Sequence, residues 1–146
     1  MTTELANRTA TRGSIEALQR EMSKYPQAQL ETFHFWADGM YARVVKRPAG
    51  VLIVGKIHKK EHLYIVTKGK VRVASDTGST VYEAGDVIIS KPGTKRAVFA
   101  LEDSICMTVH RCEETDLEKI EEELVENDEQ TLFGPGNKLK VLPCRS

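Results

Sequence analysis

The sequence predicts a mainly β protein built as one barrel of short strands, with a short helix before it and an acidic helix after it. Between residues 30 and 111, short apolar runs are separated by turn signals, a pattern typical of a barrel or sandwich. Residues 15–24 and 116–126 instead repeat their apolar side chains with a helical period. The 146 residues suit one core. We therefore expect an arm with the first helix over 1–29, the barrel over 30–112, and the second helix with a tail over 113–146.

The first helix is predicted to begin after Ser14, whose hydroxyl can cap it, and to end before Pro26. Ile15, Leu18 and Met22 stand at positions i, i+3 and i+7. They form one apolar stripe, which indicates a helix that packs on another element.

Nine short strands are expected in the barrel region. The clearest turn is Asp38-Gly39, because glycine accepts the positive φ that a tight hairpin requires. We expect the last two strands to pair with each other around residues 102–104. The predicted strands cover 33–36, 41–45, 51–57, 63–67, 71–74, 81–82, 87–90, 96–100 and 105–110.

The second helix follows Thr115-Asp-Leu-Glu118, which has the form of a capping box. Leu117, Ile120 and Leu124 form its apolar stripe, predicted to dock on the barrel. Residues 113–129 carry ten acidic side chains and one lysine, which leaves 20 basic against 11 acidic side chains elsewhere. We expect the acidic side of this helix to face solvent or the basic surface of a neighbouring subunit. Residues 139–142 are expected either to form a last strand or simply to dock.

Composition excludes several classes of protein. Cys106, Cys112 and Cys144 show no CxxC spacing, which argues against a disulfide framework and a cysteine zinc site. No apolar run approaches the ~20 residues that cross a bilayer, and the first residues lack the apolar core of a secretion signal. We therefore expect a cytoplasmic protein whose partner is neither a membrane nor a nucleic acid.

Two segments carry most of the functional information. Residues 55–69 and 85–93 each suggest a strand, a turn and a second strand between spaced glycines. Together they resemble the two halves of the cupin signature. The resemblance implies a jelly-roll β-barrel around an interior pocket that usually holds a metal. Its four ligand positions fall here on Lys56, His58, His62 and Arg96.

A wider set of motifs over about residues 30–126 resembles small, uncharacterised cupin-like proteins of tailed phages. That resemblance implies a setting in the host cytoplasm. The motifs are Ala37-Asp-Gly39, Gly55-Lys-Ile-His58, Glu61-His62, Lys91-Pro-Gly-Thr-Lys-Arg96, Thr108-Val-His110 and Glu114–Leu124.

The leading functional hypothesis is a pocket that binds a small anionic molecule, with phosphorylated molecules among the candidates. Lys56 and Arg96 replace metal ligands by proton donors, and cations beside a divalent metal are repulsive. Arginine has a planar fork that matches phosphate or carboxylate. The hydrogen-bonding residues of this pocket would be His58, His62, His110 and Tyr64.

Two alternatives stay open. In the first, His58, His62 and His110 hold a divalent transition metal, with Glu61 as a possible fourth ligand, and the protein is a metal-dependent enzyme. In the second, the chain is a structural or interaction module without a small ligand. In each case we expect a homo-oligomer, because barrels of this type often bury an outer sheet face or exchange an N-terminal strand. His34 is expected to be structural.

Overall fold

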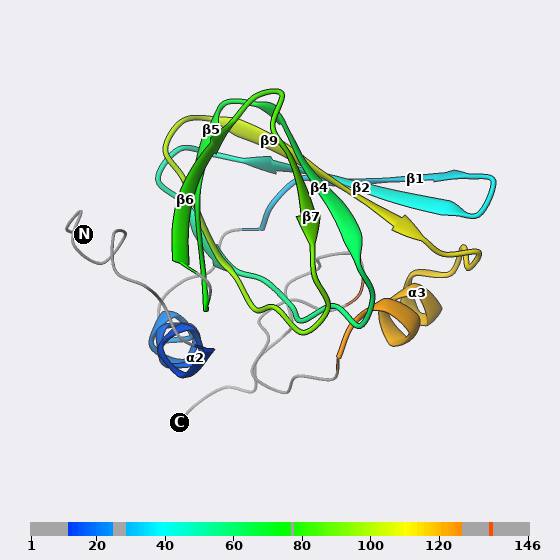
Figure 1. Cartoon of the computed structure of the whole chain (residues 1–146), viewed down its shortest axis with the longest axis horizontal. Coiled ribbons are helices and arrows are strands. Elements are labelled where there is room, and N and C mark those ends of the chain that lie inside the picture. The colour runs from blue at the N-terminus through cyan, green and yellow to red at the C-terminus, as the bar shows by residue number, and fades with distance from the viewer. Residues whose placement is uncertain (1–11, 25–28, 77, 127–134, 136–146) are drawn as a thin grey trace.

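The protein is a barrel of two antiparallel sheets, seen here in a computed structural model that describes residues 12–24, 29–76, 78–126 and 135 (Figure 1). One sheet has five strands in the order β1-β2-β9-β4-β7, and the other has four in the order β3-β8-β5-β6. The strands are β1 (Thr32–Ala37), β2 (Met40–Arg47), β3 (Leu52–Val54), β4 (His62–Lys68), β5 (Lys70–Ser75), β6 (Gly78–Glu83), β7 (Val87–Ser90), β8 (Ala97–Ala100) and β9 (Ser104–Arg111). The prediction of a mainly β, jelly-roll type barrel is confirmed.

Alternation along the strands places the core between the two sheets. Every second residue of β5, and likewise of β9, is buried, because successive side chains of a strand point to opposite faces. The largest group of buried side chains joins both sheets, and it contains Tyr64, Val66, Val71, Val73, Val98 and Cys106.

Two positive-φ turns shape the barrel. Asp38 and Gly39 have φ of 42° and 77° and join β1 to β2, which confirms the predicted hairpin. Gly69, at φ 81°, carries the chain from β4 in one sheet to β5 in the other. A side-chain carbon at Gly69 would lie 2.4 Å from the carbonyl oxygen of Asp103, so this crossing requires glycine.

The predicted pairing of the last two strands is wrong. β8 lies between β3 and β5, whereas β9 lies between β2 and β4 in the other sheet. Residues 101–103 therefore form a corner between sheets, where the amide of Leu101 donates to the carbonyl of Lys70 at 2.9 Å. As a result, His110 approaches His62 through the β4–β9 ladder and does not pair with the strand that follows Arg96.

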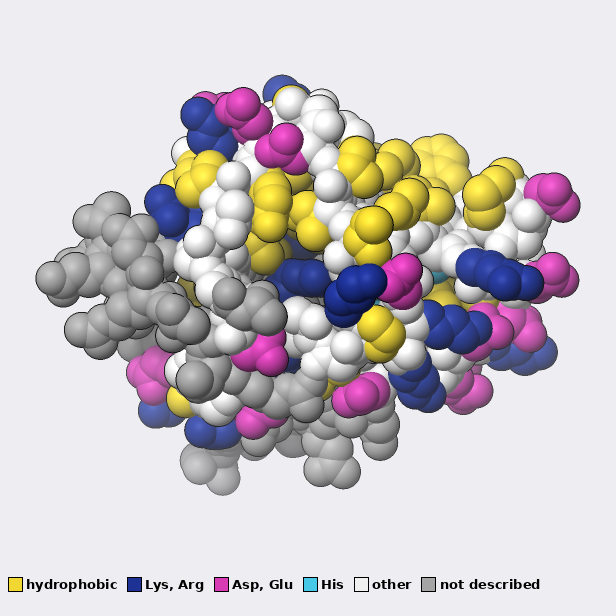
Figure 2. Space-filling view, viewed as in Figure 1, with side chains coloured by type: hydrophobic (Ala, Val, Ile, Leu, Met, Phe, Trp, Pro, Cys, Tyr) yellow, Lys and Arg dark blue, Asp and Glu magenta, His cyan; other side chains and the backbone are white. Residues whose placement is uncertain are grey.

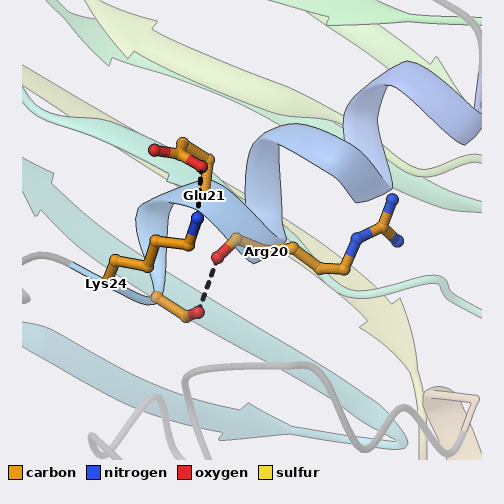
Figure 3. A network of polar contacts seen from close by, with 4 residues as sticks. Arg20, Glu21 and Lys24 are labelled. Carbon is orange, nitrogen blue, oxygen red and sulfur yellow. Dashed lines mark hydrogen bonds and ion pairs between the residues drawn. The ribbon is translucent and has the colours of Figure 1, made fainter.

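Helix α2 (Arg12–Met22) packs on the four-stranded sheet. Ile15 is buried against Val54 and Ala97. The helix begins two residues before Ser14, so the expected cap lies inside it. Figure 3 shows its C-terminal end, where Lys24 Nζ lies 2.9 Å from Glu21 Oε2. The Ser23 hydroxyl donates to the carbonyl of Arg20 there. Neither described helix is long and apolar enough to cross a membrane.

Helix α3 (Leu117–Leu124) lies on the opposite side of the barrel in Figure 1. Its cap is Asp116, not Thr115, because the Asp116 carboxylate accepts from the amides of Glu118 and Lys119 at 2.9 and 3.3 Å. The predicted docking of its apolar stripe is confirmed. The residues that pack together there are Tyr41, Cys112, Leu117, Ile120, Leu124 and Val125. The expected strand over 139–142 and Cys144 lie outside the described residues.

Candidate metal centre

Three histidines from separate segments converge at one end of the barrel. His58 lies in the loop after β3, His62 begins β4, and His110 lies near the end of β9. Leu63 pairs with Val109, so the neighbouring His62 and His110 face each other across two strands. One ring nitrogen of each imidazole lies within 4.8 Å of those of the other two. We name these three residues the histidine cluster.

Burial keeps the histidine cluster neutral. His62 and His110 are only 5% and 4% exposed. Desolvation lowers the pKa of His58 to about 2, of His62 to about 4 and of His110 to about 3, and the positive charge of Arg43 adds to this in each case. At neutral pH all three rings therefore offer a lone pair, which is the form that binds a metal.

Neighbouring groups orient two of the rings. His110 Nε2 lies 2.9 Å from Thr108 Oγ1, and His62 Nδ1 lies 3.4 Å from the carbonyl oxygen of Lys60. Each contact leaves the opposite ring nitrogen available to a ligand. Tyr41 stacks on His110 with ring centroids 5.8 Å apart, and its hydroxyl is hydrogen-bonded to His34 Nδ1 at 2.6 Å. His34 thus supports the cluster from outside, in line with the structural role expected for it.

The donor set fits a divalent transition metal. Three neutral imidazoles are a common protein ligand set for zinc, iron, nickel or copper, and they leave further coordination positions open. Glu61 is not part of the cluster, because its carboxylate pairs with Lys91 at 2.6 Å on the surface.

The loop that carries His58 is held by helix α3. Its lysine side chains reach the helix at three points: Lys56 forms an ion pair with Glu121, Lys59 Nζ donates to the carbonyl of Glu122 at 2.7 Å, and Lys60 Nζ lies 3.5 Å from Glu123 Oε1. The backbone adds an isolated β-bridge between His58 and Val125. We name this contact the loop–helix clamp.

The clamp corrects two expectations. Lys56 was expected to lie on a strand over 51–57 and to help bind an anion in the pocket, but β3 ends at Val54 and the Lys56 ammonium pairs with Glu121. Lys56 lines the cavity yet already has an acidic partner. The acidic side of α3 was expected to face solvent or a second subunit. Glu118, Glu122, Glu123 and Glu126 are exposed as expected, but Glu121 pairs with Lys56 of its own chain.

A cavity of about 90 Å³ lies in the barrel beside the histidine cluster. Its lining includes Arg96 and Tyr64, both predicted as ligand-binding residues, together with Arg43 and Arg47, which were not. Arg96 Nη1 donates to Ser90 Oγ at 2.5 Å. Burial raises the pKa of Tyr64 to about 12, so its hydroxyl stays protonated and can donate.

The two missed arginines had a signal in the sequence. Tyr41, Arg43, Val45 and Arg47 alternate along β2, and Tyr41 and Val45 are buried in the structure. Period-two alternation places all four on the inward face of that strand. Two arginines on the face of a strand that also carries core residues indicate a polar interior.

Solved structures share this fold. The DMSP lyase DddQ from Ruegeria pomeroyi has a TM-score of 0.52 at 19% identity, covering 60% of this chain and 50% of its own. A cupin superfamily protein from Desulfitobacterium hafniense has 0.51 at 11% identity, covering 61% and 83%. KdgF from Halomonas sp. has 0.50 at 18% identity, covering 56% and 76%. No protein-family model and no curated protein matches the sequence. At these identities the likeness shows the fold, and the chain has a cupin fold.

Proposed function

We propose that the protein binds a divalent transition metal at His58, His62 and His110 and a small ligand in the adjoining barrel cavity. The observation that carries this proposal is the convergence of three neutral imidazoles from three separate segments. A metal bound there would supply Lewis-acid chemistry or activate water or dioxygen. That chemistry makes the protein a candidate enzyme, as sequence analysis had kept open.

The rest of the site prepares the three ligands. The loop–helix clamp positions His58, and Tyr41 packs against His110. Apolar side chains around α3 close one side of the cluster from water. The cavity on the other side of the cluster contains cationic side chains that can bind and orient a ligand. The resemblance to proteins of tailed phages would place this function in an infected host cell.

Elemental analysis tests the metal site directly. Protein purified without a histidine tag is expected to carry zinc, iron, nickel or copper, or to take up about one equivalent on addition. His62→Ala and His110→Ala should lose that metal, whereas Glu61→Gln, at the surface carboxylate that pairs with Lys91, should retain it. Less than about a tenth of an equivalent in the wild type after metal addition would refute the proposal.

A metal-free binding protein is the second candidate. It corresponds to the anionic-ligand hypothesis from the sequence, and the cationic lining of the cavity favours it. The structure changes its residues, since Lys56 is paired with Glu121 while Arg96 lines the cavity. The module hypothesis stays a prediction, because the clamp pairs only part of the acidic face that suggested an outside partner.

A further inference from the structure

We propose that the barrel cavity binds a small oxyanion, a carboxylate or a phosphate, with Arg47 as its main anchor and Arg43 and Arg96 beside it. This inference rests on the proposed function in that the anion occupies the ligand cavity next to the metal site. It identifies the class of ligand and the residues that hold it.

The charge of the cavity wall is the first argument. Arg43, Arg47, Lys56 and Arg96 line the cavity, and no acidic side chain of the described residues does. Glu121 compensates Lys56 from outside the lining. The guanidinium groups of Arg43, Arg47 and Arg96 then border one small interior space, where like charges close together repel one another. A bound anion reduces that repulsion.

Unsatisfied donors are the second argument. Arg47 Nε and Nη1 are buried, and neither has a hydrogen-bond partner among the described residues. The Tyr64 hydroxyl, buried near Cys106, has no nitrogen or oxygen partner there either. Arg47 and Tyr64 line the same cavity. Buried donors without a nitrogen or oxygen acceptor are rare in folded proteins, and the acceptor oxygens of a ligand would satisfy them.

The size of the cavity limits the ligand. A buried water needs about 10–15 Å³ of such space, so about 90 Å³ accommodates only a few non-hydrogen atoms. Acetate, oxalate and inorganic phosphate are of this size, whereas a nucleotide is much larger. Figure 2 shows Lys and Arg side chains recessed in the centre of one face, below hydrophobic side chains, in keeping with an anion site inside the barrel.

Thermal-shift and calorimetric titrations test this proposal with three probes: acetate, oxalate and phosphate, each against chloride at equal ionic strength. We expect at least one oxyanion to stabilise the protein. Arg47→Met should weaken its binding by about tenfold or more, while Arg111→Met, an exposed arginine at the end of β9, should leave it unchanged. A carboxylate-only or phosphate-only response identifies the ligand class and supports the site.

Arg47→Met also has a readout that needs no ligand. Replacing a guanidinium whose buried Nε and Nη1 have no hydrogen-bond partner among the described residues by an apolar side chain should maintain or raise the thermal midpoint in chloride. A lowered midpoint would mean that Arg47 has a structural role and would overturn the proposal. So would a protein that no oxyanion stabilises beyond chloride, or Arg47→Met binding within about twofold of wild type.

One experiment distinguishes failure of the anion site from failure of the metal site. Titrations with chelator-treated protein and with zinc-loaded protein test the anion site in both states. Oxyanion binding that persists after chelation, in a protein that takes up no metal, supports the anion site alone. A protein that binds zinc but no oxyanion in either state retains the metal site alone.

An independent observation concerns the outer face of the five-stranded sheet. Two rows of apolar side chains cross all five strands in register. One row is Phe35, Ala42, Val109, Leu63 and Ile89, and the other is Phe33, Val44, Met107, Ile65 and Val87. Phe35, Val87 and Ile89 are 56%, 59% and 57% exposed. Figure 2 shows hydrophobic side chains gathered over this side of the barrel, around β1, β4 and β7.

We infer that a second copy of this chain covers that face. The exposed parts of the two rows amount to about 500 Å², more than half of the ~800 Å² that each partner buries in a stable interface. Monomeric proteins seldom leave such a continuous apolar patch in water. A two-fold axis places the same two rows on each other, so one face serves both copies.

Light scattering tests this contact at micromolar concentration. The wild type should have twice the chain mass of 16.4 kDa. Val87→Glu should yield monomers, whereas Val81→Glu, an exposed valine of the other sheet, should remain dimeric. A monomeric wild type, or a Val87→Glu dimer as stable as wild type, would overturn the inference.

Discussion

Replacing Glu121 by glutamine removes one half of the loop–helix clamp's best buried ion pair. The Lys56 side chain is 7% exposed and that of Glu121 is 22%. Loss of one partner from a fully buried pair costs about 3–5 kcal/mol, and an exposed pair contributes about 0–1 kcal/mol. Because Lys56 is buried and Glu121 is partly exposed, we expect a loss of about 2–3 kcal/mol. For a chain of this length, that lowers the thermal midpoint by about 6–10 °C.

Urea and thermal unfolding would measure the loss. Glu118→Gln is the matched control, because it changes an exposed glutamate of the same helix and should cost less than about 0.5 kcal/mol. The double variant Lys56→Met with Glu121→Leu should recover much of the stability, since neither change then leaves a buried charge unpaired. Equal losses in Glu121→Gln and Glu118→Gln would refute the reasoning.

Three further predictions concern stability. In the metal-free protein, the lowered pKa values of the histidine cluster make the unfolded state bind more protons as the pH falls through 6.5. Stability should therefore level off above about pH 7.5 and fall by about 1.5 kcal/mol per histidine between pH 6.5 and pH 5; a flat urea midpoint over this range would contradict it. Gly69→Ala should cost about 3–5 kcal/mol and Gly50→Ala only about 1–2, because both have positive φ but a new side chain meets Asp103 at the first and nothing within 4 Å at the second; similar urea midpoints would argue against the clash. Ile120→Ala, at a residue 4% exposed in the α3 interface, should cost about 2–4 kcal/mol in the same assay and expose α3 to proteolysis.

Local signals predicted the fold well. The Asp38-Gly39 turn and the apolar stripe of α3 depend on a few neighbouring residues, and both occur as expected. The pairing of β8 and β9 could not be predicted in this way. A short connection suits a hairpin and also a corner between two sheets, and only the contacts of Lys70 and Gly69 with residues 101–104 determine which one forms.

The site was predictable in part. Alternation in β4 and β9 brings His62 and His110 to one face, and the convergence of the three histidines follows the sequence hypothesis. The ion pair of Lys56 with Glu121 could not be predicted, because the two residues lie 65 positions apart in the sequence and only the docking of α3 brings them together. Arg43 and Arg47 were not predicted, because the cupin signature covers only residues 55–69 and 85–93. Both arginines belong to β2, which lies before these two segments in the sequence.

The clamp couples two processes that are usually treated separately. His58 belongs to the loop that α3 holds, so ordering that loop is part of the free energy both of docking the helix and of assembling the three ligands. By thermodynamic linkage, a metal that binds the ordered loop would stabilise the docking of α3. A change that weakens this docking would lower the metal affinity by the same factor. Amide hydrogen exchange in residues 117–124 would then follow metal occupancy, and α3 would report at the protein surface whether the interior is loaded.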